Sequence, residues 1–300
     1  MTNSIANTEK NKRTGPSGHV RLSEGALFSG AFFYSRQILK PEKGLPKTTK
    51  MAFLIALTCL CFTASPGSLA ACHQQKIDLQ TRGVRIIDGD TIDIANGKRI
   101  RLIGINTPEI GYRGKSSERF AAEAKQAISA MLRSSAYRIK LQFGQERYDR
   151  YGRTLAHVFL ADGRNIAEQL LLQGLAVRVA FPPNLWGQDC YHSSERQARR
   201  VKKALWRDNI TPVGQLQPGQ RGFQIVRGEV TRIGQSKKSI WLNLGDHFAV
   251  RIARRDLGQF QSVDPRQLLH KTLQVRGWIV SKKNKSIMHL RHSSMLEIMK

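Results

Sequence analysis

A strand–turn–strand pattern around residue 96 constrains the fold more than any other feature of this chain. Residues 84–94 are rich in β-branched side chains, and residues 99–105 have the composition of a second strand. The four residues between them contain Asn96-Gly97, which is a strong short-range signal for a β-hairpin. The sequence therefore predicts an antiparallel β unit as the start of the folded region.

The segments that follow alternate between helical and extended patterns. Apolar residues recur at helical spacing in residues 117–133, and residues 137–143 and 155–160 are predicted strands. Two further helices are expected over residues 165–175 and 193–206. This order predicts an α+β, mainly β domain, to which we assign residues 72–207.

A second domain is expected at the C-terminus. Residues 208–222 are rich in Pro, Gly and Gln and are the predicted linker. Residues 223–300 then contain five strand candidates and no helical pattern, which fits a small Greek-key barrel of the OB type. The candidates are residues 223–233, 239–244, 247–252, 272–280 and 286–292.

The charge of the chain is strongly unbalanced. The formal net charge is +27 and the isoelectric point is about 10.6. Such a field attracts polyanions, of which nucleic acid is the commonest. The alternative is a basic surface that binds nothing in particular.

An export signal is predicted some distance from the first residue. Residues 51–71 contain an apolar run after Lys47 and Lys50, followed by the small residues Ser68 and Ala70. The run is short for a membrane span. We expect a signal peptide and a secreted or periplasmic protein. Residues 1–50 are expected to be an N-terminal extension that is either disordered or the result of a start codon assigned too early. If that extension blocks the signal, the protein would be cytosolic.

Two cysteines remain after removal of the signal. Cys72 and Cys190 form an even count, which in an exported chain favours one disulfide. The alternative is that the segment ending at Cys72 is a lipoprotein processing site. Cys72 would then carry a lipid anchor and Cys190 would be unpaired.

The first chemically suggestive segment is Asp88-Gly89-Asp90. Asp is depleted in strands, so two carboxylates beside a glycine are unusual in a predicted strand. They are a plausible site for a hard cation, because Ca²⁺ and Mg²⁺ take oxygen ligands. Taken alone, an acidic turn explains them better.

The second strand of the hairpin brings further polar groups to the same region. A two- or three-residue turn places Arg101 opposite Thr91 or Ile92, and both registers bring it close to Asp90. The strand then delivers Asn106, Thr107 and Glu109 into a loop. Pro108 restricts Thr107 to an extended conformation, which fixes the direction of the Thr107 carbonyl.

A charged turn, Asp149-Arg150-Tyr151-Gly152-Arg153, supplies a second guanidinium. The planar fork of an arginine suits phosphate oxygens. A phosphodiesterase needs a base that activates water and positive charge that stabilises the transition state. Asp90, Arg101, Glu109 and Arg153 together supply that set.

These motifs, in this order, resemble the staphylococcal-nuclease-like, or thermonuclease, family from about Val84 to Trp206. The landmarks are Asp88-Gly89-Asp90-Thr91, Arg101-Leu102, Thr107-Pro108-Glu109, residues 149–153 and Gln173-Gly174-Leu175-Ala176. The resemblance implies a five-stranded OB-fold barrel with three helices and Ca²⁺ in the active site. It also implies endonucleolytic cleavage of DNA and RNA that leaves 3′-phosphate ends.

The resemblance also implies a role for each site residue. Asp90, Asn106 and the Thr107 carbonyl would hold the metal, with Asp88 beside them. Glu109 would be the general base, Arg101 and Arg153 would stabilise the phosphate, and Arg150 and Tyr151 would contact the nucleotide. Asn106 stands where the family has a carboxylate, so we expect weaker metal binding and leave other divalent cations open. Val179 and Phe181 replace tyrosines of the family, which puts nucleotide contacts there in doubt.

Two other functions stay open at this point. The first is a protein on the same barrel that binds nucleic acid without cutting it, and Asn106 is the only residue that favours it. The second is a lipid-anchored protein that uses its basic face for adhesion. Trp241 and Trp278 in the C-terminal domain are either stacking platforms for single strands or core residues. We expect a monomer.

Overall fold

A computed structural model of the chain describes residues 72–217, 219–282 and 285–299. The predicted extension and signal peptide, residues 1–50 and 51–71, lie outside these residues. Among the described residues, no helix is both long and apolar enough to cross a membrane.

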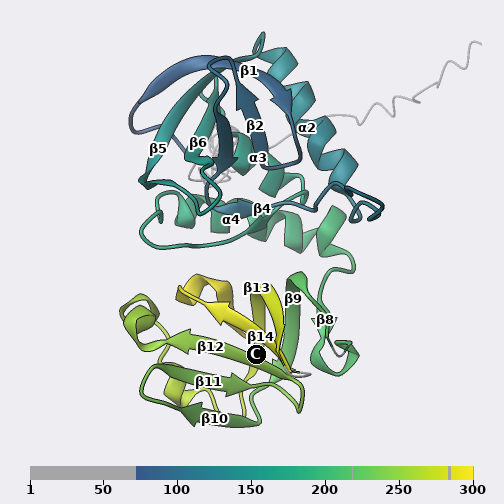
Figure 1. Cartoon of the computed structure of the whole chain (residues 1–300), viewed down its shortest axis with the longest axis vertical. Coiled ribbons are helices and arrows are strands. Elements are labelled where there is room, and N and C mark those ends of the chain that lie inside the picture. Colours follow the sequence, from purple (N-terminus) through teal and green to yellow (C-terminus); the bar gives the residue numbers. More distant parts are fainter. Residues whose placement is uncertain (1–71, 218, 283–284, 300) are drawn as a thin grey trace, which may run out of the picture. The chain divides into compact units, whose positions relative to one another are not determined.

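The first domain is a closed barrel of five strands with three α-helices (Figure 1). The strands follow one another around the barrel as β1, β2, β3, β6 and β5. Their bounds are β1 Leu79–Ile86, β2 Thr91–Ile94, β3 Arg99–Leu102, β5 Arg138–Tyr148 and β6 Thr154–Leu160. The helices are α2 Ala121–Ser134, α3 Ile166–Leu172 and α4 Gln188–Arg200. The predicted five-stranded barrel with three helices is confirmed.

The predicted strand over residues 84–94 is wrong in its middle. β1 ends at Ile86 and β2 begins at Thr91, so Asp88-Gly89-Asp90 forms the connection between two strands. The backbone N–H of Asp90 donates to the Asp88 carboxylate at 3.0 Å, which closes this turn locally. Gly89 is required there, because a Cβ atom would lie 2.7 Å from the Thr107 hydroxyl and from the Ala124 side chain.

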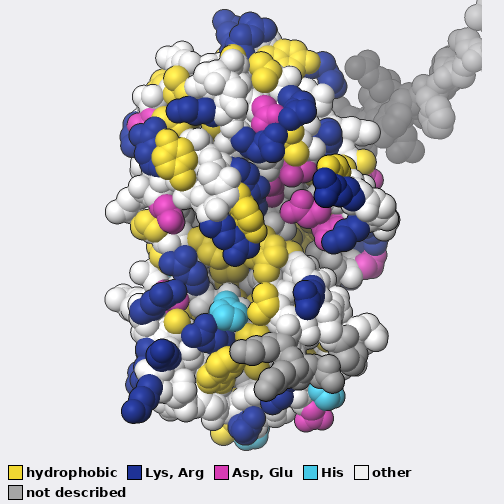
Figure 2. Space-filling model, in the orientation of Figure 1, with side chains coloured by type: hydrophobic (Ala, Val, Ile, Leu, Met, Phe, Trp, Pro, Cys, Tyr) yellow, Lys and Arg dark blue, Asp and Glu magenta, His cyan; other side chains and the backbone are white. Residues whose placement is uncertain are grey.

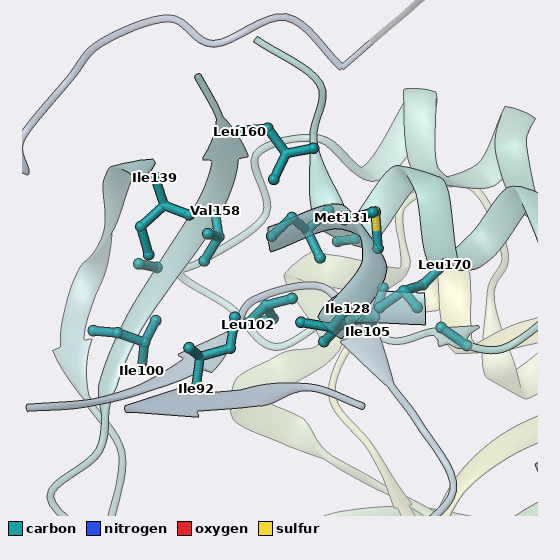
Figure 3. Packing of buried hydrophobic residues seen from close by; sticks show 14 of the residues in the cluster. Ile92, Ile100, Leu102, Ile105, Ile128, Met131, Ile139, Val158, Leu160 and Leu170 are labelled. Carbon is teal, nitrogen blue, oxygen red and sulfur yellow. The ribbon is translucent and has the colours of Figure 1, made fainter. Parts of the chain in front are cut away.

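The barrel core is made of alternating strand residues and one face of each helix. Ile92, Ile100 and Leu102 point inward from β2 and β3, and all are almost completely buried. Figure 3 shows Leu102 on the side of Ile128 and Met131 of α2, with Ile100 on the side of Ile139, and all belong to one hydrophobic cluster. Truncating such a residue to alanine typically costs about 2–5 kcal/mol, so this core fixes the strands that carry the polar groups described below.

A two-stranded sheet connects the barrel to the segment before α4. β4 Ile105–Asn106 pairs antiparallel with β7 Val177–Arg178. The next residues, Val179 and Ala180, are buried in the hydrophobic core of the C-terminal domain. Strand β4, which follows β3, is therefore held by its pairing with β7, and β7 is held in turn by the burial of the residues that follow it.

The C-terminal domain is a curled sheet in the order β10-β11-β12-β14-β13-β9-β8, with β15 paired to β13. The prediction of a second small β domain is confirmed, although the candidate strand 223–233 is two strands, β9 and β10. The bounds are β8 Thr211–Pro212, β9 Gly222–Glu229, β10 Arg232–Gln235, β11 Ser239–Asn243, β12 Phe248–Ala253, β13 Thr272–Lys282, β14 Lys285–Leu290 and β15 Leu296–Ile298. Short 3₁₀ helices lie at 204–206, 213–215, 254–260, 265–267 and 293–295.

A buried ion pair joins α4 to strand β13. Arg276 Nη1 lies 2.6 Å from the Glu195 carboxylate, and both side chains are fully buried. Arg276 also contacts Glu297 of β15, which receives a hydrogen bond from Arg199 of α4 at 2.6 Å. The other oxygen of Glu195 accepts the backbone N–H of Arg178 at 2.8 Å. This network pairs each buried charge with an opposite charge, as burial of ions requires, although the Nε atoms of Arg276 and Arg178 are buried without a hydrogen-bond partner.

Cys72 and Cys190 are joined by a disulfide, with their Cα atoms 5.5 Å apart. The bond ties the segment before β1 to the first turns of α4. The backbone N–H of Cys72 also donates to Glu168 of α3 at 3.2 Å. The start of the described chain is therefore held against two helices of the first domain.

Candidate active site

The polar groups predicted from the hairpin lie just before β2, on β3 and at the end of β4, and hydrogen bonds connect them. The register pairs Thr91 with Arg101, which decides between the two alternatives left open by the sequence. Arg101 Nη2 lies 3.0 Å from the Asp90 carboxylate, and the Asp90 and Arg101 side chains are 3% and 12% exposed. A buried ion pair of this kind is held by hydrogen bonds around it.

Those hydrogen bonds come from the predicted metal ligands. Asp90 accepts from the Thr107 backbone N–H at 3.1 Å and from the Thr91 hydroxyl at 3.1 Å. The Asn106 amide donates to the Thr107 carbonyl at 3.2 Å, and its oxygen lies 3.4 Å from Arg101 Nη2. The structure thus brings Asp90, Asn106, Thr107 and Arg101 into one cluster.

Burial shapes the electrostatics of this cluster. Desolvation raises the pKa of Asp90, with a further contribution from the charge of Asp88 that opposes the lowering by Arg101. Glu109 lies on the exposed loop that follows Pro108. Partial desolvation and the charges of Asp90 and Asp88 raise the pKa of Glu109 to about 7. Three carboxylates therefore repel one another beside a single guanidinium.

The loop that carries Glu109 is closed on itself. The backbone N–H of Glu109 donates to the Glu118 carboxylate at 3.0 Å, and the Glu118 N–H donates to the Glu109 carbonyl at 3.0 Å. Gly111 permits this close approach, since a Cβ atom there would lie 2.0 Å from the Lys115 carbonyl oxygen. Glu118 was missed from the sequence, because nothing local shows that a residue nine positions away closes the loop.

The second guanidinium is positioned by its own turn. The Asp149 carboxylate accepts Arg153 Nε at 2.7 Å and the backbone N–H groups of Tyr151 and Arg153 at 2.9 and 3.0 Å. β3 and β6 are parallel neighbours that pair Arg101 with Leu155, so Arg153 follows Arg101 on the same side of the barrel. Asp149 was not singled out, although its i, i+4 spacing to Arg153 and its place in a turn were a usable signal.

Arg150 and Tyr151 lie at the tip of the same turn. The Arg150 guanidinium donates to the Tyr151 hydroxyl at 2.6 Å and lies 4.7 Å from the centre of its ring. Tyr151 is 68% exposed, so its aromatic face is open to a ligand. The two predicted substrate-binding residues are thus close to Arg153 in the chain, and their side chains contact each other.

Seven of these side chains border one cleft of about 1390 Å³, and Asp88, Asp90, Thr91, Thr107 and Glu118 are not among its lining residues. The lining from the first domain includes Arg101, Asn106, Glu109, Arg150, Tyr151 and Arg153. Strands β13 and β14 supply the remaining wall, with Trp278, Ile279, Val280, His289 and Arg291. Figure 2 shows a hollow on this face with hydrophobic side chains in its floor and Lys and Arg around it.

The oxygen atoms of the cluster fit a hard cation. Among the described residues, no three His, Cys, Asp or Glu side chains are grouped to hold a metal, so a site rich in charged ligands is absent there. The Asp90 carboxylate, the Asn106 amide and the Thr107 carbonyl nevertheless belong to one hydrogen-bonded cluster, and oxygen atoms of these kinds are the ligands that Ca²⁺ and Mg²⁺ take. The repulsion among Asp88, Asp90 and Glu109 would also be relieved by positive charge.

Comparison with known proteins gives a consistent result. A family model described as "Staphylococcal nuclease homologue" matches residues 99–208, a range that includes Arg101, Glu109 and Arg153. The thermonuclease of Staphylococcus hyicus is 33% identical over 160 residues, covering 52% of this chain and 92% of that protein. The thermonuclease of Staphylococcus intermedius is 32% identical over 125 residues, covering 41% and 73%. Endonuclease YncB of Bacillus subtilis is 32% identical over 126 residues, covering 41% and 59%.

Proposed function

Because the chain belongs to the staphylococcal nuclease family and is a nuclease, we propose that Glu109, Arg101 and Arg153 carry out its hydrolysis of phosphodiester bonds. The observation that carries the proposal is the convergence of two guanidinium groups and a carboxylate on one cleft. We propose an endonuclease acting on DNA, RNA or both, as the resemblance implies.

Glu109 is the proposed general base. Its carboxylate borders the cleft, and its pKa of about 7 suits a group that accepts a proton near neutral pH. Water near Glu109 would lose its proton to this carboxylate as it attacks phosphorus. The bond from phosphorus to the 5′ oxygen would break, and that oxygen would leave with a proton taken from solvent. The loop closure through Glu118 keeps the Glu109 backbone in place while the side chain acts.

Arg101 and Arg153 are the proposed phosphate ligands. Each guanidinium is held by a carboxylate, Asp90 or Asp149, and neither requires reorganisation when charge develops on the phosphoryl oxygens. Donors placed in advance in this way typically contribute about 10²–10³ in rate each. Arg150 and Tyr151 would contact the nucleotide from the tip of the turn.

Asp90, Asn106 and the Thr107 carbonyl are the proposed ligands of a divalent cation, with Ca²⁺ as the first choice. When bound, such a cation supplies positive charge to the phosphate and lowers the pKa of a coordinated water. Asn106 contributes an oxygen without a charge, so a weaker site is expected than with a second carboxylate.

We further propose that the protein is exported. The apolar segment 51–71 supports this, as does the disulfide between Cys72 and Cys190, since such bonds persist in oxidising compartments. A sulfur atom in a disulfide cannot also carry a lipid thioether, so we propose an unanchored protein. Mass spectrometry of the exported protein tests this, and a lipid on Cys72 would refute it.

The direct test of the catalytic proposal is digestion of plasmid DNA and of RNA in Ca²⁺, in Mg²⁺ and in chelator. We expect cleavage that requires a divalent cation and falls by at least about 10²-fold in Glu109→Gln. Glu123→Gln is the matched control, because Glu123 is an exposed acid on α2 away from the cleft. Equal activity of Glu109→Gln and wild type would refute the assignment of the base.

A further inference from the structure

The wall of the cleft opposite the catalytic groups belongs to the C-terminal sheet. Trp278 of β13 is 38% exposed, whereas Trp206 at the base of α4 is 6% exposed. The Trp278 ring packs edge-on against Phe223 at 4.9 Å and lies 5.8 Å from Phe181, between ring centres. It is therefore fixed by aromatic neighbours while more than a third of its surface remains open.

Trp278 begins a row of aromatic and basic side chains that crosses the sheet. β13 and β14 pair Ile279 with Met288, so Trp278 and His289 are neighbours on the outer face. β14 and β12 pair His289 with Arg251, and β12 and β11 pair Arg251 with Trp241. The alternate residues, such as Ile240, Val250, Ile252 and Met288, are buried in the core of the domain. The row thus lies on the face turned away from that core.

The members of this row contact one another. Arg251 lies 3.2 Å from the His289 ring nitrogen and 5.8 Å from the centre of the Trp241 ring. Gly234 stands opposite Trp241 on the edge strand β10, so no side chain covers the ring from there. Across four neighbouring strands, two tryptophan rings thus flank one histidine and one arginine.

Charge and volume indicate the kind of ligand. Among the described residues that line the cleft, those from the C-terminal sheet include His289 and Arg291 but no acid. The cleft volume of about 1390 Å³ exceeds the roughly 300–1,000 Å³ that encloses one small molecule. The wall is therefore suited to a polyanion with flat, apolar groups that is longer than a single nucleotide.

We propose that the row Trp278–His289–Arg251–Trp241 binds a single-stranded segment of the nucleic-acid substrate next to the scissile phosphate. Bases would stack on Trp278 and Trp241, and Arg251 and His289 would contact the phosphates between them. In a duplex the bases are already stacked on one another, which favours single strands on this surface. The proposal rests on the proposed function in one respect: the nucleic-acid strand bound by the row would continue to Arg101 and Arg153.

The test is a binding measurement, so that it does not depend on whether Glu109 acts as a base. A fluorescently labelled oligonucleotide of about 16 thymidines and a duplex of equal length are titrated with the protein in chelator, in the Glu109→Gln background. Trp278→Ala is expected to weaken single-strand binding about five- to 100-fold, the range for loss of one stacked base. Trp278→Phe should restore most of the affinity, and duplex binding should change less than twofold.

Two controls separate binding from folding and from general charge. Arg251→Gln should weaken single-strand binding several-fold with a smaller salt dependence. Arg266→Gln is the matched variant, because Arg266 is exposed on the same domain and pairs with Asp264. Equal affinity of Trp278→Ala and its parent would overturn the proposal. So would an equal loss in Trp278→Phe, in Arg266→Gln or on the duplex.

Discussion

The two β domains both present basic side chains to the cleft, but they hold them differently. In the nuclease barrel each proposed catalytic guanidinium is paired with a carboxylate, and the Asp90–Arg101 pair is almost buried. On the C-terminal sheet, Arg251 contacts a histidine and a tryptophan, and Trp278 is substantially exposed. Fixed charge suits the stabilisation of a transition state, whereas an open aromatic row suits binding of a varied strand.

The two domains are joined by a charge pair that neither activity uses. Arg276 and Glu195 are fully buried, and Glu195 also holds the backbone of Arg178, whose strand pairs with the strand of Asn106. The two domains therefore differ in how they hold their basic side chains, yet a buried ion pair connects them close to the site.

The largest predicted effect concerns this connection. Arg276→Met leaves Glu195 buried without its charged partner, so the free energy of unfolding should fall by about 3–5 kcal/mol. Urea denaturation measures the change, and the exposed Arg266→Met is the control. A double variant with Glu195→Gln should recover part of the loss, because the unpaired charge is then removed. A loss below about 1 kcal/mol in Arg276→Met would contradict a stabilising role for the pair.

The next prediction compares two similar turns. Arg153 and Arg164 each donate Nε to an aspartate at 2.7 Å, but only Arg153 borders the cleft. Arg153→Ala should lower kcat about 10²–10³-fold, because it removes a donor to the transition state. Arg164→Ala should leave kcat unchanged. Steady-state kinetics on one oligonucleotide decide between them, and similar losses in both variants would remove the proposed role of Arg153.

Much of this organisation was predictable because its causes are local. The hairpin, the helices and the strands of the second domain follow from turn residues and from the spacing of apolar side chains. The predicted strand 84–94 runs through Asp88-Gly89-Asp90 because β-branched residues flank it on both sides, although the acidic turn favoured for these three residues alone is what the structure has. Two contacts interrupt the strand here. The backbone N–H of Asp90 donates a hydrogen bond to the Asp88 carboxylate, and Gly89 packs against Thr107.

The remaining features depend on contacts between distant segments. The register that pairs Thr91 with Arg101 was one of two that the turn allowed. The pairing of Arg276 with Glu195 joins residues 81 positions apart, and no pattern near either residue signals it. Trp278 was undecided between core and surface, because its exposure depends on how β13 lies against Phe181 and Phe223.

A pH effect on stability should belong to the nuclease barrel. The His157 side chain is 2% exposed, and its Nδ1 atom forms a hydrogen bond with the Tyr191 hydroxyl at 2.9 Å. Desolvation lowers the pKa of His157 to about 3. The unfolded chain then binds one more proton below pH of about 6.5, so stability is full above that pH and falls as pH drops toward 3. The raised pKa of Glu109 has the opposite effect between pH 7 and 4.5, because there the folded state binds the extra proton. His157 by itself should contribute a slope of about 1.4 kcal/mol per pH unit.

His157→Asn should remove that slope when unfolding is followed between pH 7 and 5. The exposed His270 of the C-terminal domain provides the matched variant, His270→Asn, which should keep the wild-type slope. An unchanged slope in His157→Asn would show that another group dominates acid sensitivity.

The smallest predicted effect sharpens the description of the cation site. Asn106→Asp adds a carboxylate beside Asp90 and Thr107, so Ca²⁺ affinity should rise about tenfold, a gain of about 1.4 kcal/mol. Calorimetric titration with Ca²⁺ measures it in the absence of substrate. Asn184→Asp is a control on a buried asparagine that bonds the Glu146 backbone instead. Unchanged affinity in Asn106→Asp would place the cation elsewhere.

The central claim is that Glu109 performs chemistry while other groups hold the strand. Single-turnover cleavage of a labelled oligonucleotide, with protein in excess and Ca²⁺ present, tests it most directly. Glu109→Gln should bind the strand within about threefold of wild type but cleave it at least about 10²-fold more slowly. Cleavage by Glu109→Gln at the wild-type rate once the strand is bound would contradict the account.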